Sequence, residues 1–388
     1  MEFYHATMNK WIVISVFFLL AINVLAQDEK SVTLKFKGQA IGYTHFNPSN
    51  EQPWWLGVRY LPQLNSEIKL KNSRLIDFEA SANVYGNITL AGSGGMENDG
   101  DLKPYRLWAR YSAPQFEIRA GLQKINFGSA SMLRPLMWFD QIDPRDPLKL
   151  TDGVWGILGR YYFMNNANVW LWTLYGNEHR KGWEMNTTAK GKPEFGGRLQ
   201  YPIPLGEAAI SYHHRVTSVQ NPFMSIISLT DIPENRVGID VRIDWTLGTW
   251  FEASWTNMET DFGQFDNQQV LNLGFDYTVG LGSGLYVAFE QLLLAYEEKA
   301  FAFERPISFS LLSMSYPLGL FDNISTIVYY DWNNNNAYNF VNYQHQFKHL
   351  NLYLMGYWNP ENFSMPSPGG TSNLFGGKGV QLMLVWNH

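Results

Sequence analysis

Hydrophobic and polar residues alternate with a period of two along most of the chain, which is the pattern of β-strands with one apolar face. The stretch VTLKFKGQAIGY at 32–43 shows this first, and RLIDFEASANVYG at 74–86, NRVGIDVRIDW at 235–245 and VLNLGFDYTV at 270–279 repeat it. Alternation alone fits a soluble sandwich or a barrel. The connections between the strands therefore have to decide the architecture.

Short and long connections follow one another in strict order along the chain. The short turns lie at 112–115, 164–168, 202–206, 246–248, 280–284, 317–322 and 348–350. The long loops between them lie at 91–103, 124–153, 177–192, 216–234 and 359–377. Sorting of connections into two kinds is typical of transmembrane β-barrels, which have short turns at one end and long loops at the other. In a β-sandwich, nothing requires short and long connections to alternate.

The length of the chain predicts the number of strands. At roughly 20 residues per strand and connection, the part after residue 26 accommodates ~18 strands, an even number that returns both ends to one side. The expected strands lie near 32–46, 56–70, 75–90, 104–111, 116–124, 154–163, 169–176, 194–201, 207–215, 235–245, 249–258, 269–279, 285–295, 307–316, 323–332, 338–347, 351–358 and 378–387. Two of these, 307–316 and 338–347, alternate poorly. We predict an all-β, antiparallel transmembrane barrel.

Residues 1–26 have the form of a cleaved secretory signal peptide. Lys10 precedes an apolar run over 11–25, and small residues stand before Gln27. A retained membrane anchor is the alternative, although the run is short for a span. The chain has no cysteine, so no disulfides stabilise it after export. We expect residues 27–388 to form one barrel in the outer membrane.

Aromatic residues and the C-terminus support a membrane location. Aromatic residues are as frequent as charged ones, at 16% each. The final stretch GKGVQLMLVWNH resembles the C-terminal strand that outer-membrane assembly machinery reads, although the last residue is His388 and not an aromatic. Tryptophans at strand ends are expected to form interfacial girdles: Trp54, Trp55, Trp155, Trp245, Trp250, Trp332, Trp358 and Trp386.

The segment RAGLQKINFG at 119–128, followed by LRPLMWFDQIDPRDP at 133–147, resembles a recurrent part of Gram-negative porin-like barrels. The nearest families are the alginate-export porins and the phosphate-selective porins O and P. In such families this loop folds into the lumen, which implies that 124–153 forms a constriction. Carried over, the resemblance places seven residues at or near it: Phe127, Arg134, Asp140, Asp143, Arg145, Asp146 and Lys149. A barrel of ~16–18 strands independently needs material to narrow its bore.

Charged residues at inward positions are expected to set ion preference. Early strands carry mostly basic ones: Lys35, Lys37, Arg59, Arg106, Arg110, Arg119, Arg160, Arg198 and Arg215. Later strands carry acidic ones: Asp240, Asp244, Glu252, Asp276, Glu290 and Asp331. We expect Arg106, Arg110, Arg119, Arg160, Asp240 and Asp276 to determine selectivity through a transverse field. The alternative is that these charges pair with neighbours and keep the lumen wet.

Other chemistries find little support. The spacing of Asp140, Asp143 and Asp146 lacks the pattern of an EF-hand, so pairing with Arg134 and Arg145 is favoured over calcium. His213 and His214 point to opposite faces of a strand and cannot chelate one metal together. No nucleophile neighbours His214, so we expect neither an enzyme nor a cofactor or metal. The polar stretches NTT near 186 and WNNNNAYN at 332–339 are interpreted as solvated outer surface.

The sequence thus predicts a porin for passive diffusion of small hydrophilic, charged solutes, embedded in outer-membrane lipid. Two alternatives remain: export of an anionic polysaccharide, and a barrel subunit or scaffold of an outer-membrane complex. The net charge of −6 argues against a nucleic-acid partner. A homo-oligomer is left open.

Overall fold

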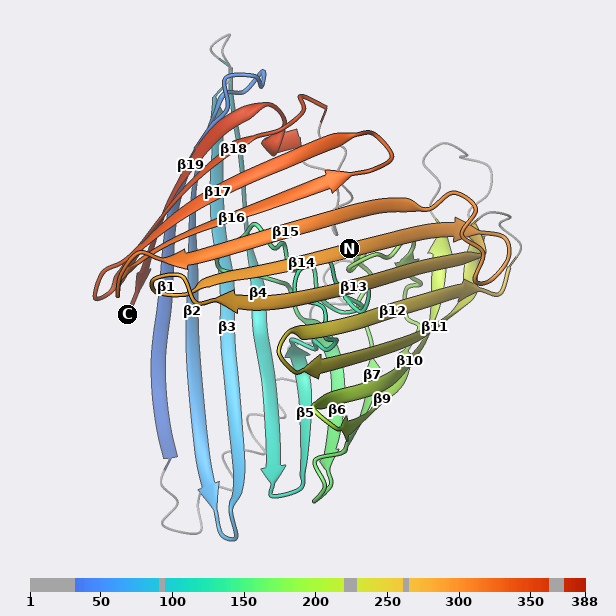
Figure 1. Cartoon of the computed structure of the whole chain (residues 1–388). Coiled ribbons are helices and arrows are strands. Elements are labelled where there is room, and N and C mark those ends of the chain that lie inside the picture. The colour runs from blue at the N-terminus through green and yellow to red at the C-terminus, as the bar shows by residue number, and fades with distance from the viewer. Residues whose placement is uncertain (1–31, 91–94, 220–228, 261–264, 363–372) are drawn as a thin grey trace.

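A computed structural model describes residues 32–90, 95–219, 229–260, 265–362 and 373–388, and the expected signal peptide at 1–26 lies outside them. In the described part, nineteen strands form one sheet; β8 has two residues and the other eighteen build the wall (Figure 1). The strands are β1 Val32–Phe46, β2 Trp54–Leu70, β3 Arg74–Leu90, β4 Met96–Ala113, β5 Phe116–Gln123, β6 Val154–Tyr162, β7 Asn168–Leu174, β8 Thr187–Thr188, β9 Glu194–Ile203, β10 Gly206–Val219, β11 Leu229–Asp244, β12 Gly248–Met258, β13 Asn267–Val279, β14 Leu285–Glu297, β15 Ile307–Pro317, β16 Asp322–Asp331, β17 Asn336–Gln346, β18 Leu350–Trp358 and β19 Lys378–Asn387. The described part also includes a short 3-10 helix, η2, at Asn373–Phe375.

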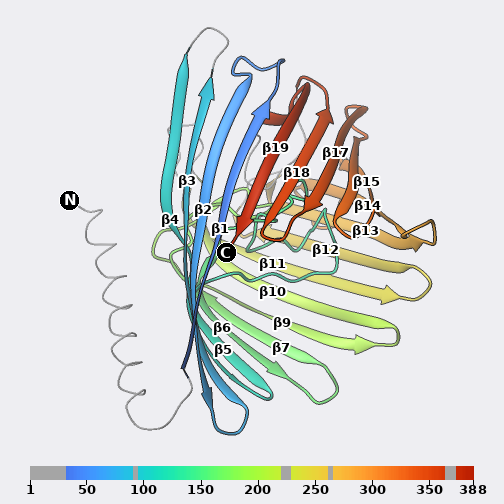
Figure 2. The same cartoon turned by 90° about the vertical axis from the view of Figure 1, so that its left-hand side faces the viewer.

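The sheet closes on itself because the first and last strands pair. Gln39 of β1 lies opposite Asn387 of β19, and the antiparallel register continues to Phe46 opposite Val380. Figure 2 shows β1 and β19 side by side. Closure leaves no free sheet edge at this seam, which is the condition for strands to cross lipid. The predicted antiparallel barrel is therefore confirmed.

Alternate residues of each strand face lipid or the interior. On β6 and β7, Ile157 and Leu171 are 55% and 65% exposed, whereas Leu158 and Trp172 on the opposite face are 0% and 2% exposed. A lipid-facing barrel surface requires large apolar side chains at its outward positions. The exposed residues Ile157 and Leu171 meet this requirement. The period-two pattern thus encodes the two faces of the wall.

One side of the interior is apolar, and this explains the two strands whose alternation is poor. We call this surface the apolar inner wall; it runs over β13–β18 and comprises Val270, Leu292, Leu294, Phe309, Leu311, Tyr329, Tyr338, Phe340, Met355 and Tyr357. The two poorly alternating stretches, 307–316 and 338–347, correspond to β15 and β17. Their inward positions are apolar because they belong to one buried cluster with Leu133 of the long segment 124–153, and Phe340 of β17 also contacts the Phe375 ring.

Several predicted boundaries were wrong in detail. The expected loop 91–103 is largely strand, since β4 begins at Met96 and pairs with β3 up to Leu90. Likewise, β10 and β11 extend into the expected loop 216–234. Two tryptophans do not belong to a girdle: Trp250 is buried and donates a hydrogen bond to Asn272, and Trp55 lines an internal cavity.

Candidate functional site

The segment 124–153, called the inward loop below, crosses the interior of the barrel. It leaves β5 at Gln123 and returns at Val154, two residues that are paired in the wall. Between these points its backbone reaches Glu252 on β12 and Glu290 on β14. Figure 1 shows its irregular trace within the ring of strands. The wall therefore continues without interruption behind the loop.

Two wall carboxylates anchor the inward loop. Glu290 accepts hydrogen bonds from the backbone N–H groups of Ser131, Met132 and Leu133 at 2.8, 3.0 and 2.6 Å. Glu252 accepts them from Ala130 and Leu136 at 2.8 and 2.6 Å. Both carboxylates are fully buried. Backbone N–H groups in an irregular segment need acceptors when buried, and these acids supply them.

Three of the predicted constriction residues are buried inside the loop. Arg134 pairs with Asp140 at 2.9 Å and also donates to the carbonyl of Phe127 at 3.0 Å. Phe127 packs against Trp138, Phe139, Trp170 and Trp172. Within this group the arginine, its partner and the ring hold the shape of the loop.

The remaining predicted constriction residues lie on the C-terminal part of the inward loop. Asp143 pairs with Arg145 at 2.6 Å, and the guanidinium of Arg145 lies 4.8 Å from the Phe375 ring. Asp146 accepts hydrogen bonds from its own loop, from Leu148 and Leu150 N–H. Lys149 is exposed and has a φ of 48°. The expected pairing with arginine is confirmed for Asp140 and Asp143.

The Asp146 carboxyl belongs to the loop and not to a strand. Burial raises its pKa, whereas the N–H groups of Leu150 and Leu148 and, more weakly, the charge of Arg59 lower it. Arg59 on β2 is thus close enough to stabilise the Asp146 charge. Within the described ranges, no group of three or more acids and histidines could hold a metal ion.

Three of the four arginines singled out in the sequence come together on β4–β6. Arg110 and Arg160 contact Glu117 at 3.3 and 3.0 Å, and Arg119 lies 3.9 Å from the same carboxylate. Asp77 holds Arg110 from the other side at 2.8 Å. Both acids were missed in the sequence, although their inward parity on β3 and β5 is readable there.

The fourth arginine has another role. Arg106 donates to the backbone carbonyl of Thr151 at 2.9 Å, so it ties the end of the inward loop to β4. The two predicted acidic selectivity residues are paired as well. Asp240 binds Arg198 at 2.6 Å and is 1% exposed, and Asp276 binds Arg242 at 3.3 Å.

A second segment, 175–193, also packs against the interior and was not foreseen. Its Thr187–Thr188 pair forms β8 against Ser218 and Thr217 of β10, and Thr188 is 3% exposed. The interpretation of NTT as solvated surface was therefore wrong. Polar composition misled because the polar groups of this segment meet polar partners inside the barrel.

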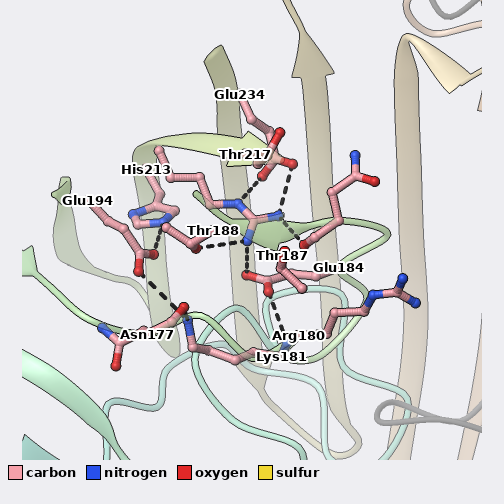
Figure 3. Close-up of polar contacts among 12 residues, drawn as sticks. Asn177, Arg180, Lys181, Glu184, Thr187, Thr188, Glu194, His213, Thr217 and Glu234 are labelled. Atoms are coloured by element: carbon pink, nitrogen blue, oxygen red, sulfur yellow. Dashed lines mark hydrogen bonds and ion pairs between the residues drawn. The ribbon is translucent and has the colours of Figure 1, made fainter. Parts of the chain in front are cut away.

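Buried charges hold this second segment, as Figure 3 shows. Glu184 contacts both Arg215 and Arg236 at 2.9 Å, and Glu234 contacts Arg215 at 2.6 Å. Nearby, Glu194 lies 3.2 Å from His213 and 3.7 Å from Lys181. The segment also binds the inward loop, since the Trp183 indole donates to the Arg134 carbonyl at 2.8 Å. The inward loop and the segment 175–193 are thus in direct contact inside the barrel.

Within the described ranges, no helix has the length and apolar character needed to cross a membrane. The fold is that of a transmembrane antiparallel β-barrel with an inward loop after β5. Solved structures of this architecture are similar to it over nearly their whole length.

OccK5 (OpdH) of Pseudomonas aeruginosa aligns with 91% of this chain and 97% of its own at a TM-score of 0.56 and 12% identity. A BenF-like porin from Pseudomonas fluorescens Pf-5 aligns with 92% and 98% at a TM-score of 0.55 and 11% identity. OccAB1 of Acinetobacter baumannii aligns with 93% of this chain and 98% of its own at a TM-score of 0.54 and 9% identity. The resemblance to Gram-negative porin-like barrels is thus confirmed at the level of the fold. No family model and no curated protein match the chain.

Proposed function

We propose that this protein is an outer-membrane porin through which small hydrophilic, charged solutes diffuse passively, with a preference for anions. The proposal is supported by an asymmetry in exposure. The side chains of Arg110, Arg119 and Arg160 remain 26%, 15% and 17% exposed, whereas Glu252 and Glu290 on the facing wall are fully buried under the inward loop. These three arginines are therefore more accessible to a solute in the lumen than the two carboxylates under the inward loop.

The inward loop is proposed as the constriction. Of the seven residues predicted to lie there, Asp143 is partly exposed and Lys149 is exposed, so these two are the most accessible to a passing solute. Phe127, Arg134 and Asp140 act by keeping the loop in shape, and Arg106 by holding its end. Glu117 and Asp77 pair with these arginines and partly neutralise their charge. The anion preference should therefore be moderate and not absolute.

Reversal potentials in planar bilayers under a salt gradient test this. Replacing Arg110, Arg119 and Arg160 by glutamate should shift the reversal potential toward cations, and replacing them by glutamine should give an intermediate shift. Arg305→Glu is the matched control, because Arg305 is exposed in a connection and not on the wall. The shift should shrink with salt, since the Debye length falls from about 10 Å at 0.1 M to about 3 Å at 1 M.

Folded variants that leave the selectivity of the wild type unchanged would contradict the arginine mechanism. Absence of any conductance in correctly folded wild-type protein would instead favour a scaffold. Heat-modifiable migration on gels verifies folding of each variant before its current is recorded.

A further inference from the structure

A cavity of about 190 Å³ lies between the inward loop and the wall formed by β1, β2, β18 and β19. It exceeds the ~150 Å³ cavity that accepts a benzene ring. Its size therefore suits a small organic solute and not a polymer.

The β2 side of the cavity carries a positive charge, that of Arg59. Trp55 and Arg59 both line it, and neither the Trp55 indole Nε1 nor the Arg59 Nε has a hydrogen-bond partner. Among the described residues, Arg59 also makes no ion pair, unlike Arg110, Arg119 and Arg160 on β4, β5 and β6. A guanidinium without an ionic partner forms charge-assisted hydrogen bonds with a carboxylate. This side of the cavity thus matches a ligand that carries a carboxylate.

The loop side of the same cavity offers negative charge. Asp143 and Asp146 line it, and the side chain of Asp143 is 35% exposed although it holds Arg145. The two arginines and two aspartates of the cavity sum to zero charge, so a simple anion or cation gains at one side and loses at the other. A solute with both charges complements both sides.

Apolar residues fill the space between these charged groups. Ile41, Leu148, Met355 and Met383 line the cavity, and they would contact the apolar part of a solute. We propose that this cavity is a binding site for small amphipathic zwitterions, such as neutral α-amino acids of the size of leucine, with the carboxylate at Arg59 and the ammonium group at Asp143 and Asp146. The proposal rests on the proposed porin function and names a solute class for it.

Three probes with the same branched apolar part distinguish the contributions of the two charges to binding. They are L-leucine, isoamylamine, which lacks the carboxylate, and 4-methylpentanoate, which lacks the ammonium group. Single-channel recordings should show current interruptions by leucine at concentrations about tenfold lower than those needed for either analogue. Arg59→Gln and Asp146→Asn should each abolish this advantage. Asp146→Asn keeps one side-chain oxygen for the Leu148 N–H, and Arg305→Gln is the control outside the lumen.

Equal potency of the three probes, or leucine interruptions that persist in Arg59→Gln, would overturn the zwitterion site while ion conductance left the porin function intact. Calorimetric titration of leucine into the detergent-solubilised barrel gives an independent readout. Binding there without conductance would reject the porin function and keep the site. Absence of binding in both assays would reject the site.

Discussion

Glu290 should control how firmly the inward loop is held. In Glu290→Ala, the N–H groups of Ser131, Met132 and Leu133 lose their acceptor, and the one of Leu133 is buried. A buried donor left unsatisfied costs about 1–3 kcal/mol. The costs of the three N–H groups do not simply add, and removing the Glu290 carboxylate also removes the cost of burying its charge. We therefore expect the inward loop to be destabilised locally by about 4 kcal/mol.

Hydrogen exchange followed by mass spectrometry measures this directly. A loss of about 4 kcal/mol corresponds to roughly a thousandfold faster exchange at 131–133, because each 1.4 kcal/mol is a factor of ten. Glu290→Gln keeps one acceptor oxygen and should give a smaller increase. Exchange in the strands of the wall should not change.

Glu97→Ala serves as the control, because Glu97 is exposed on β4 far from the loop contacts. Unchanged exchange at 131–133 in a folded Glu290→Ala protein would refute the reasoning. Packing of Leu133 on the apolar inner wall, and not the carboxylate, would then hold this part of the loop.

Three further predictions concern other parts of the molecule. Gly182→Ala should loosen the segment 175–193, because a Cβ there would lie 1.6 Å from the Met137 carbonyl oxygen at a φ of 46°, and trypsin should then cut faster after Arg180 or Lys181. Replacing the outward-facing Leu382, Leu384 and Trp386 of β19 by serine should leave unassembled protein in the periplasm, as fractionation would show, since this strand closes the barrel against β1; normal outer-membrane levels would count against that role. Deleting 134–149 should raise single-channel conductance and admit larger solutes in liposome swelling, and an unchanged conductance would contradict a constriction.

The strands were predictable because each encodes its own two faces. Period-two alternation needs no knowledge of distant neighbours, and the order of short and long connections fixes which strands are adjacent. Alternation was poor on β15 and β17, where Phe309, Leu311, Tyr338 and Phe340 point inward yet are apolar. A single sequence cannot reveal that a loop more than 150 residues away covers them.

The site was predictable only where partners are close along the chain. The pairs Arg134–Asp140 and Arg145–Asp143 lie within one loop, so their charges and spacing suggested them. Glu252 and Glu290 looked like lumen charges, and their role as acceptors for the loop depends on contacts across the barrel. The segment 175–193 was missed for the same reason, because Arg215 of β10 and Arg236 of β11 neutralise its Glu184 from other strands.

The apolar inner wall has a consequence for anyone who would use this barrel as a sensing nanopore. Leu292, Phe309 and Leu311 are 1%, 2% and 0% exposed while the inward loop covers them. Shortening the loop would wet these side chains at a cost of about 1.5–3 kcal/mol each, and aromatic analytes would adsorb there. A hydrophobic stretch in a channel also favours intermittent drying. A wide pore with a steady current would therefore need serine or threonine at these three positions, all of which lie on the adjacent strands β14 and β15.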